Sequence, residues 1–278
     1  MIISVLNKKG GSGKTTSTAT LSTLLGALGN KVLVVDIDPQ CNITALLNVN
    51  NPSNTINNLF LEKSSRIDYE YVKSCIYETE YKNVDIIPGY EDLDMTIDKI
   101  SVHMSRIPQL ILKKSFDYIE DDYDYILIDN TPYFNLLTRN ALCASDYVII
   151  PVDCDGFSYE GLSKLIEKVI DTKEELNPSL DILGVFLTKV NNRTKLYKQL
   201  NEGYTDQLGS KFMKTYIRHD NKVKVSNTEY EPLPYYDKNS KALQDYMRLL
   251  IEFDILNDDS LSLLKEQLVD EVEQVDNI

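Results

Sequence analysis

Short apolar runs recur along the chain, and most are separated by stretches with a helical pattern. The runs are rich in β-branched residues and cover residues 1–6, 31–36, 83–88, 123–129, 144–152 and 180–187. Continuous apolar runs of this length are typical of strands buried on both faces of a parallel sheet. The pattern between them predicts helices over residues 17–28, 69–77, 105–118 and 240–253, and one more after residue 155. This alternation predicts a doubly wound α/β fold with a mostly parallel sheet.

The first predicted strand runs straight into a glycine-rich segment, NKKGGSGKTT, at residues 7–16. Three glycines allow consecutive backbone N–H groups to face one point and form an anion-binding nest where the next helix begins. Lys14 adds a positive charge for the β- and γ-phosphates of a nucleotide, and the Thr15 hydroxyl is placed for Mg²⁺. A simple glycine turn is the alternative, but the Lys-Thr-Thr that follows favours a phosphate-binding loop. Its predicted nucleotide-binding residues are Gly10, Gly11, Ser12, Gly13, Lys14, Thr15 and Thr16.

The loop departs from the common G-x-x-x-x-G-K-[ST] pattern, because Lys8 stands where the first glycine would be and Lys9 follows it. The segment KGGSGKTT resembles the deviant Walker A motif of the ParA/MinD family of ATPases, and the resemblance extends over about residues 1–253. It implies a P-loop fold that binds ATP and Mg²⁺. It also implies that Lys9 reaches across a homodimer interface to the phosphates of the partner's ATP. Such a cation would stabilise charge on the transferring phosphoryl group, as an arginine finger does.

Carboxylates follow two of the predicted strands. The segment DIDPQCNIT resembles the family's D-x-D-P-Q-x-N-x-T, which implies that Asp36 supports the magnesium shell and that Asp38 positions the attacking water. Asp129 ends another apolar run, as a Walker B carboxylate near Mg²⁺ does. Asp-Pro after a strand is also a common turn signal, and strand-end aspartates often cap helices. Because these segments occur together with the phosphate loop, we favour a metal-binding role for Asp36 and Asp129. We assign Asp38 a role in catalysis, together with Lys9 and Lys14.

The end of the last predicted strand and a later loop hold the remaining candidates. The resemblance implies that these regions grip the adenine, which makes Asn191 and Asn221 candidate nucleotide contacts. Arg193 and Lys224 fall where relatives that act on plasmids and chromosomes carry cations for nonspecific DNA binding, and Lys222 lies near Lys224. Between residues 193 and 224 basic side chains outnumber acidic ones nine to three, one histidine included. This local excess suits contacts to a phosphate backbone, although a solvated surface is the alternative.

Composition limits the classes of protein that fit. The chain has 278 residues and a formal net charge of −14, which argues against a surface that coats nucleic acid as a whole. We expect one ParA-like domain over residues 1–253 and an acidic amphipathic extension over residues 254–278. No apolar run approaches the ~20 residues of a membrane helix, and we expect no signal peptide. Four scattered cysteines are typical of a reducing cytoplasm, and two histidines offer no zinc spacing.

The resemblance is strongest to the small, Soj-like ParA proteins, which implies an ATPase for DNA partition (segregation) of plasmids or chromosomes in a bacterial cytoplasm. In the implied cycle, Mg-ATP closes a sandwich homodimer through Lys9, and this dimer binds DNA nonspecifically on the nucleoid. A centromere-binding partner, ParB-like or a small ribbon-helix-helix adaptor, then stimulates slow hydrolysis and release.

Other classes are distinguished by specific features. A MinD-like, membrane-associated positioning ATPase needs affinity for anionic lipid, which the acidic tail would oppose, so we expect no membrane partner. An iron–sulfur reductase with the same loop needs a cysteine just after Asp129, and the chain has none there. A regulator that binds ATP only as a switch stays open, and it is distinguished by measuring turnover with and without DNA and partner.

Overall fold

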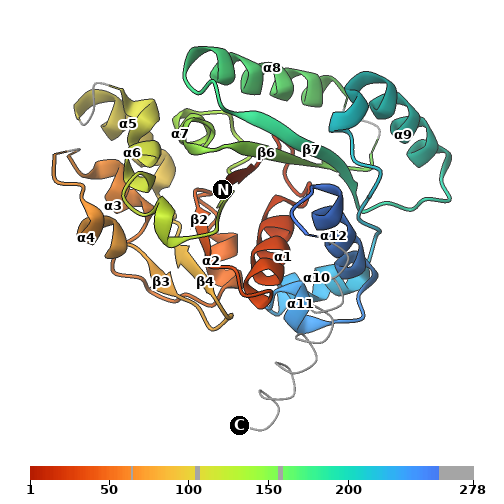
Figure 1. The fold of residues 1–278 in the computed structure, drawn as a ribbon, viewed down its shortest axis with the longest axis horizontal. Coiled ribbons are helices and arrows are strands. Elements are labelled where there is room, and N and C mark those ends of the chain that lie inside the picture. The colour runs from red at the N-terminus through yellow and green to blue at the C-terminus, as the bar shows by residue number, and fades with distance from the viewer. Residues whose placement is uncertain (64, 104–106, 156–158, 257–278) are drawn as a thin grey trace, which may run out of the picture.

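The computed structural model describes residues 1–63, 65–103, 107–155 and 159–256. Within these residues one seven-stranded sheet has the order β3-β4-β2-β5-β1-β6-β7 (Figure 1). All neighbouring strands run parallel except β3 and β4. The strands are β1 (Ile2–Val5), β2 (Val32–Asp36), β3 (Tyr77–Glu78), β4 (Val84–Ile87), β5 (Tyr125–Asp129), β6 (Tyr147–Asp153) and β7 (Asp181–Thr188). The predicted doubly wound, mostly parallel α/β fold is therefore confirmed.

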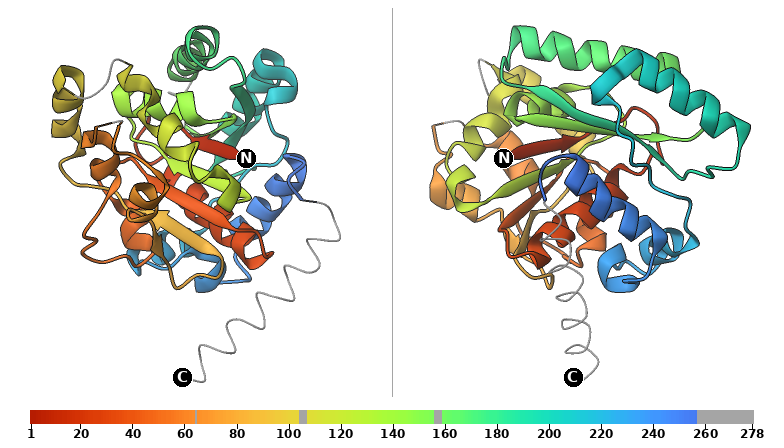
Figure 2. Two further views of the ribbon diagram at one scale, coloured as in Figure 1. Left: turned by 60° about the vertical axis from the view of Figure 1, so that its left-hand side comes forward. Right: turned by 45° about the vertical axis from the view of Figure 1, so that its right-hand side comes forward.

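Helices cover both faces of the sheet (Figures 1 and 2). They are α1 (Lys14–Ala27), α2 (Asn42–Leu46), α3 (Ile56–Leu61), α4 (Tyr69–Lys73), α5 (Leu93–His103), α6 (Ile111–Phe116), α7 (Leu136–Ala144), α8 (Tyr159–Glu175), α9 (Lys195–Leu208), α10 (Asn221–Thr228), α11 (Leu233–Tyr236) and α12 (Lys241–Glu252). Side chains of a strand alternate between its faces, so Leu127 of β5 packs with α1, α2 and α12, whereas Ile126 and Ile128 pack with α3–α7. A third cluster packs α8 and α9 on β6 and β7.

The segment between β4 and β5 differs most from the sequence prediction. The predicted helix over residues 105–118 is wrong in extent: a 3₁₀ turn at Pro108–Leu110 leads into the short α6, and residues 104–106 lie outside the description. Proline lacks an N–H and suits a first turn, which agrees with Pro108 at the start of this 3₁₀ turn. The prediction also missed α5, although Leu93, Thr96 and Ile100 are buried at helical spacing.

A second difference lies at the edge of the sheet beside β4. The predicted helix over residues 69–77 ends at Lys73, and Tyr77 starts the two-residue strand β3. The Asp68 side chain caps the short helix by accepting a hydrogen bond from Tyr71 N at 2.9 Å. A strand of two residues carries no alternation of apolar and polar positions, so the sequence pattern could not show it.

The opposite edge of the sheet is covered by residues 212–219. Isolated bridges pair Val185 with Phe212 and Val190 with Arg218, both parallel. Ile217 N donates to Leu187 O at 2.8 Å, and Val190 N donates to Ile217 O at 2.9 Å. Edge strands need such protection against pairing with other chains. These bonds also place residues 217–219 beside β7, at the edge of the sheet where the carboxyl ends of the parallel strands lie.

The last described helix, α12, begins as predicted: Ser240 is its N-cap and accepts a hydrogen bond from Leu243 N. Most of the predicted acidic extension, residues 257–278, lies outside the described residues, so the boundary at residue 253 stays a prediction. Among the described helices, none has both the length and the apolar character needed to cross a bilayer.

Candidate nucleotide and magnesium site

The glycine-rich loop joins β1 to α1 at the carboxyl edge of the sheet. Gly11 and Gly13 have φ values of 72° and 97°, a left-handed conformation that favours glycine. Gly13 is the N-cap of α1, so the loop ends where the positive end of the helix dipole lies. The Ser12 hydroxyl is fully buried and has no hydrogen-bond partner among the described residues. The loop therefore has the geometry of an anion-binding nest.

Lys14 is the most buried cation of the site, with 6% of its surface exposed. Burial lowers the pKa of its ammonium group, and the nearby carboxylates of Asp129 and Asp38 oppose this shift. Hydrogen bonds from this ammonium group to phosphate oxygens would compensate for the hydration that it loses on burial.

Two fully buried carboxylates lie on neighbouring strands below the loop. Asp36 of β2 is in register with Asp129 of β5. Asp36 accepts hydrogen bonds from Thr44 Oγ1 at 2.6 Å and Asp38 N at 3.0 Å, and Asp129 accepts one from Thr15 Oγ1 at 2.7 Å. Burial raises the pKa of Asp36 to about 7 and, together with the charge of Asp36, that of Asp129 to about 8. A bound cation would stabilise the charged forms of two buried carboxylates that lie this close together.

This donor set fits Mg²⁺. Carboxylate and hydroxyl oxygens are its preferred protein ligands, and one or two carboxylates with phosphates and waters complete its shell. The described residues contain no group of three or more His, Cys, Asp or Glu side chains that could hold a metal by itself. Asp36, Asp129 and Thr15 therefore suit a cation that arrives with a phosphate ligand.

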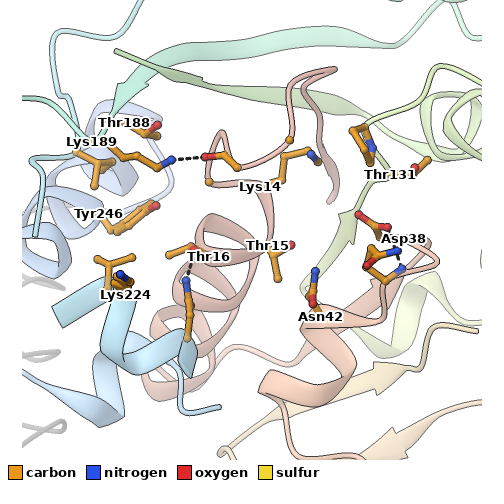
Figure 3. Close-up of a pocket in the computed structure, with 18 of the residues that line it drawn as sticks. Lys14, Thr15, Thr16, Asp38, Asn42, Thr131, Thr188, Lys189, Lys224 and Tyr246 are labelled. Atoms are coloured by element: carbon orange, nitrogen blue, oxygen red, sulfur yellow. Dashed lines mark hydrogen bonds between the residues drawn. The ribbon is translucent and has the colours of Figure 1, made fainter. Parts of the chain in front are cut away.

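Asp38 stands at the mouth of the same region, two residues beyond β2, and Gln40 N donates to its Oδ1 at 3.0 Å. Burial raises the pKa of this carboxyl group, while the Gln40 N–H and the charge of Lys14 act in the opposite direction. In Figure 3, Asp38, Asn42 and Thr131 lie on one side of the phosphate loop, and Lys189, Lys224 and Tyr246 lie on the other.

These groups line one cavity of about 640 Å³. Its wall is made of residues 10–11 and 13–16 of the loop, Asp38, Pro39, Gln40 and Asn42 after β2, Asp94 of α5, Thr131, Pro132 and Tyr133 after β5, Thr188 and Lys189 at the end of β7, residues 217–220, Val223, Lys224 and Asn227 of α10, and Tyr246 of α12. The volume is within the range of small-molecule sites. We call the side with Asp38 the phosphate end and the side with α10 and α12 the distal end.

The distal end contains residues that the sequence did not single out. Asp220 accepts hydrogen bonds from Lys222 N at 3.0 Å and Lys241 N at 2.9 Å, so one carboxylate caps both α10 and α12. Arg218 donates to the buried Asp245 at 2.7 Å through its Nε. The only signal for Asp220 in the sequence is an N-cap residue type before a short helix, which many surface aspartates share.

The predicted adenine contacts do not line the cavity. Asn191 accepts a hydrogen bond from Arg193 N at 3.2 Å within its own loop, and Asn221 is the exposed first residue of α10. Their neighbours Lys189 and Asp220 line the wall instead. Asn191 and Asn221 remain predictions, and a base in this cavity would meet their neighbours first.

The three predicted DNA contacts have different surroundings. Arg193 is exposed in the loop before α9, whereas the ammonium group of Lys222 forms an ion pair with Asp237. Lys224 is exposed and lines the cavity at its distal end. From this position the Lys224 ammonium group could contact either a nucleotide in the cavity or a DNA backbone at the surface.

Lys9 lies at the start of the loop and does not line the cavity of its own chain. Its ammonium group forms an ion pair with Asp155 and lies 3.7 Å from Asp153 Oδ2. Asp153 is the last residue of β6 and Asp155 follows it, and β6 neighbours β1 in the sheet. A lysine held by surface carboxylates can exchange them for other oxygens at little cost, because exposed ion pairs contribute little stability.

Comparison with known proteins finds relatives that match most of the chain. A family model described as an AAA domain matches residues 1–182. The sporulation initiation inhibitor protein Soj of Bacillus subtilis is 34% identical over 90% of this chain and 97% of its own length. The chromosome-partitioning ATPase Soj of Treponema pallidum is 33% identical over 89% and 94% of the two chains. A putative plasmid partition protein of Borrelia burgdorferi, solved with AMPPNP, has a TM-score of 0.75 at 27% identity and covers 91% of this chain and 97% of its own.

Proposed function

The chain belongs to the ParA/MinD family of P-loop ATPases, and on this premise we propose that it is a DNA partition ATPase driven by Mg-ATP. One observation carries the proposal. The phosphate loop with Lys14 and Asp38 line one end of a single cavity, and the buried Asp36–Asp129 pair lies directly behind this lining, hydrogen-bonded to Thr15 Oγ1 and Asp38 N. Phosphoryl transfer to water needs these parts: a cradle for the phosphates, a metal site and a group that orients the nucleophile.

In the proposed reaction the loop N–H groups and Lys14 bind the β- and γ-phosphates. Thr15, Asp129 and Asp36 would hold Mg²⁺, which when bound would supply positive charge against the charge developing on the phosphate oxygens. Asp38 accepts a hydrogen bond from the attacking water and directs its oxygen at the γ-phosphorus. The bond from water oxygen to phosphorus forms as the bond to the ADP oxygen breaks, and the products are ADP and inorganic phosphate.

We assign Lys9 to a second subunit's nucleotide. In the single chain its ammonium group is held by Asp155, away from the cavity wall. ATP on a partner subunit would offer the stronger ligand, since a polyphosphate carries more negative charge than these carboxylates. Lys9 would then leave Asp155 and complete a sandwich homodimer, so that nucleotide binding is converted into pairing.

The paired form is the one that we expect to bind DNA. Arg193 and Lys224 carry exposed cations, and Lys222 adds a third if Asp237 releases it. Contacts of this type go to phosphates and carry no sequence preference, so the binding should weaken steeply with salt. We place the protein on the bacterial nucleoid, where a centromere-binding partner, ParB-like or of the ribbon-helix-helix type, stimulates slow hydrolysis and release.

DNA binding measured with ATP, with ADP and at raised salt tests the proposal. A labelled duplex of arbitrary sequence should bind with ATP, release on exchange to ADP, and lose affinity as salt is raised. Lys14→Ala should remove the ATP effect, and Lys8→Ala, which removes an exposed lysine of the same loop, should keep it.

Equal binding to DNA with ATP and with ADP would refute the partition role. Turnover measured in parallel, with and without DNA, separates the ATPase from a regulator that uses ATP only as a switch. No turnover under any condition would leave that second function as the better account.

A further inference from the structure

Two successive residues at the end of β7 hold two successive carbonyl groups of the phosphate loop. Thr188 Oγ1 donates to Ser12 O at 2.9 Å, and Lys189 Nζ donates to Gly11 O at 2.5 Å. More than 170 residues separate the donors from the acceptors along the chain. Figure 3 shows the Lys189 side chain reaching across to the loop.

The direction of these carbonyls decides where the loop N–H groups point. In a planar trans peptide the C=O and N–H bonds point to opposite sides. The peptide that carries Gly11 O also carries Ser12 N–H, and the next one carries Ser12 O and Gly13 N–H. When β7 holds both carbonyls, both N–H groups face away from it, and neither has an acceptor among the bonds of the described residues. The two contacts therefore set the nest that a phosphate enters.

The backbone of Lys189 supports a specific role for its side chain. Its φ is 55°, a left-handed conformation that costs a residue with a Cβ atom about 1 kcal/mol or more. Such strain persists where the surrounding structure holds it, and it is most frequent at functional sites. Here the strained residue places an ammonium group against the loop.

The Lys189 ammonium group also donates to Asp153 Oδ2 at 3.1 Å, the carboxylate oxygen that lies 3.7 Å from Lys9 Nζ. Asp153 therefore retains a cation when Lys9 leaves for a partner subunit. The same contact anchors the Lys189 side chain on the loop side of the cavity.

We infer that Lys189 is a positioning residue for the phosphate loop: with Thr188, it holds the loop carbonyls so that the N–H groups are aimed at the nucleotide before the nucleotide arrives. The inference rests on the proposed nucleotide binding and deepens it. The benefit is preorganisation, because a loop already ordered loses less entropy on binding.

Lys189→Met tests the inference, since it keeps the length of the side chain and removes the charge. We expect the affinities for ADP and for a non-hydrolysable ATP analogue, both with Mg²⁺, to fall by a similar factor of about ten. The KM for ATP should rise while kcat at saturation stays close to wild type. Amide exchange in residues 10–16 of the nucleotide-free protein should become faster. Lys8→Met is the matched control, and Lys189→Arg should restore much of the affinity.

Thr188→Val removes the neighbouring hydrogen bond with little change in shape and should act in the same direction, which keeps the test valid if one variant folds poorly. Affinities equal to those of Lys8→Met would overturn the inference. A loss much larger for the ATP analogue than for ADP, and abolished by salt, would overturn it in favour of direct contact with the γ-phosphate. These affinities need no DNA or partner, so a wild type that binds nucleotide but not DNA refutes only the proposed function.

Discussion

The two ends of the cavity are built differently. At the phosphate end, the loop, Asp36, Asp38 and Asp129 are carried by three neighbouring parallel strands, β1, β2 and β5. At the distal end, the wall comes from the segment beside the edge strand β7 and from α10 and α12. There a few polar contacts, above all those of Asp220 and of Asp245, hold the elements together.

The difference follows from where each end of the cavity lies relative to the sheet. Central parallel strands are buried on both faces, so groups at their ends are placed precisely and desolvated. Precise placement and desolvation of these groups favour phosphoryl transfer at this end of the cavity. In the short α10, Ser226 alone is buried, and weakly buried regions of this kind open at lower free energy than the core. We therefore expect substitutions at the phosphate end to change binding or turnover strongly, and those at the distal end to change affinity and stability moderately.

The largest effect should come from Lys14→Ala. It removes the buried ammonium group that faces the phosphates, so the affinity for Mg-ATP should fall about a hundredfold or more. Isothermal titration calorimetry measures it, with Lys8→Ala as the control. A fall of less than about threefold would show that the phosphate end does not bind the phosphates.

Asp38→Ala should separate binding from chemistry. Without the carboxylate that orients water, turnover should fall by about 10²–10⁴ while ATP binding is retained. The variant should accumulate as an ATP-bound dimer, which sedimentation together with phosphate release detects. Rapid hydrolysis by this variant would rule out the role of Asp38.

Asp220→Ala tests the distal end. One substitution removes the caps of two helices, so stability should fall by about 2 kcal/mol, and nucleotide affinity should fall severalfold because the wall is less ordered. Urea unfolding and calorimetry measure both. Asp237→Ala, which removes the half-buried partner of Lys222, is the control and should cost less than about 1 kcal/mol.

The stability effect of Asp220 should depend on pH. Burial alone would raise its pKa, but hydrogen bonds from Lys222 N, Ser240 Oγ and Lys241 N outweigh burial and hold it below the ordinary value. A carboxyl group with a lowered pKa stabilises the folded state at neutral pH, and this contribution is lost as the pH falls through its folded pKa. The stabilities of wild type and Asp220→Ala should therefore converge in acid.

The phosphate end should show the opposite dependence on pH. The pKa values of Asp36 and Asp129 are raised to about 7 and about 8, so the folded protein binds more protons than the unfolded chain. Without ligands their contribution to stability is largest in acid and is lost as the pH rises toward 8. Calorimetric scans from about pH 6 to about pH 8.5 should show Tm falling by a few degrees, and less steeply in Asp129→Asn. The same slope in that variant would contradict a coupled carboxylate pair.

The smallest effects should come from the surface cations. Arg193→Ala and Lys224→Ala should each lower the salt dependence of DNA binding by about one phosphate contact. Lys222→Ala should have less effect, because Asp237 already holds its ammonium group. If Lys224→Ala instead weakens nucleotide binding and leaves the salt dependence unchanged, this lysine contacts the nucleotide and not DNA.

The sequence predicted the sheet, the loop between β1 and α1, and the position of Asp129 at the end of β5, because each rests on a local pattern. An apolar run followed by glycines or an aspartate is enough to place the loop and Asp129 at strand ends. The contacts at the distal end and those between β7 and the loop join residues far apart in sequence, such as Arg218 with Asp245 and Lys189 with Gly11, and no local pattern encodes them. The helix boundaries between β4 and β5 depended in the same way on tertiary packing, as the buried face of α5 shows.

The mass of the protein in solution, measured by light scattering with a non-hydrolysable ATP analogue and Mg²⁺, tests the central claim most directly. The account predicts a dimer with the analogue and a monomer with ADP, and it predicts that Lys9→Ala binds the analogue but remains a monomer. A wild type that stays monomeric when saturated, or a Lys9→Ala variant that dimerises as readily as wild type, would contradict it.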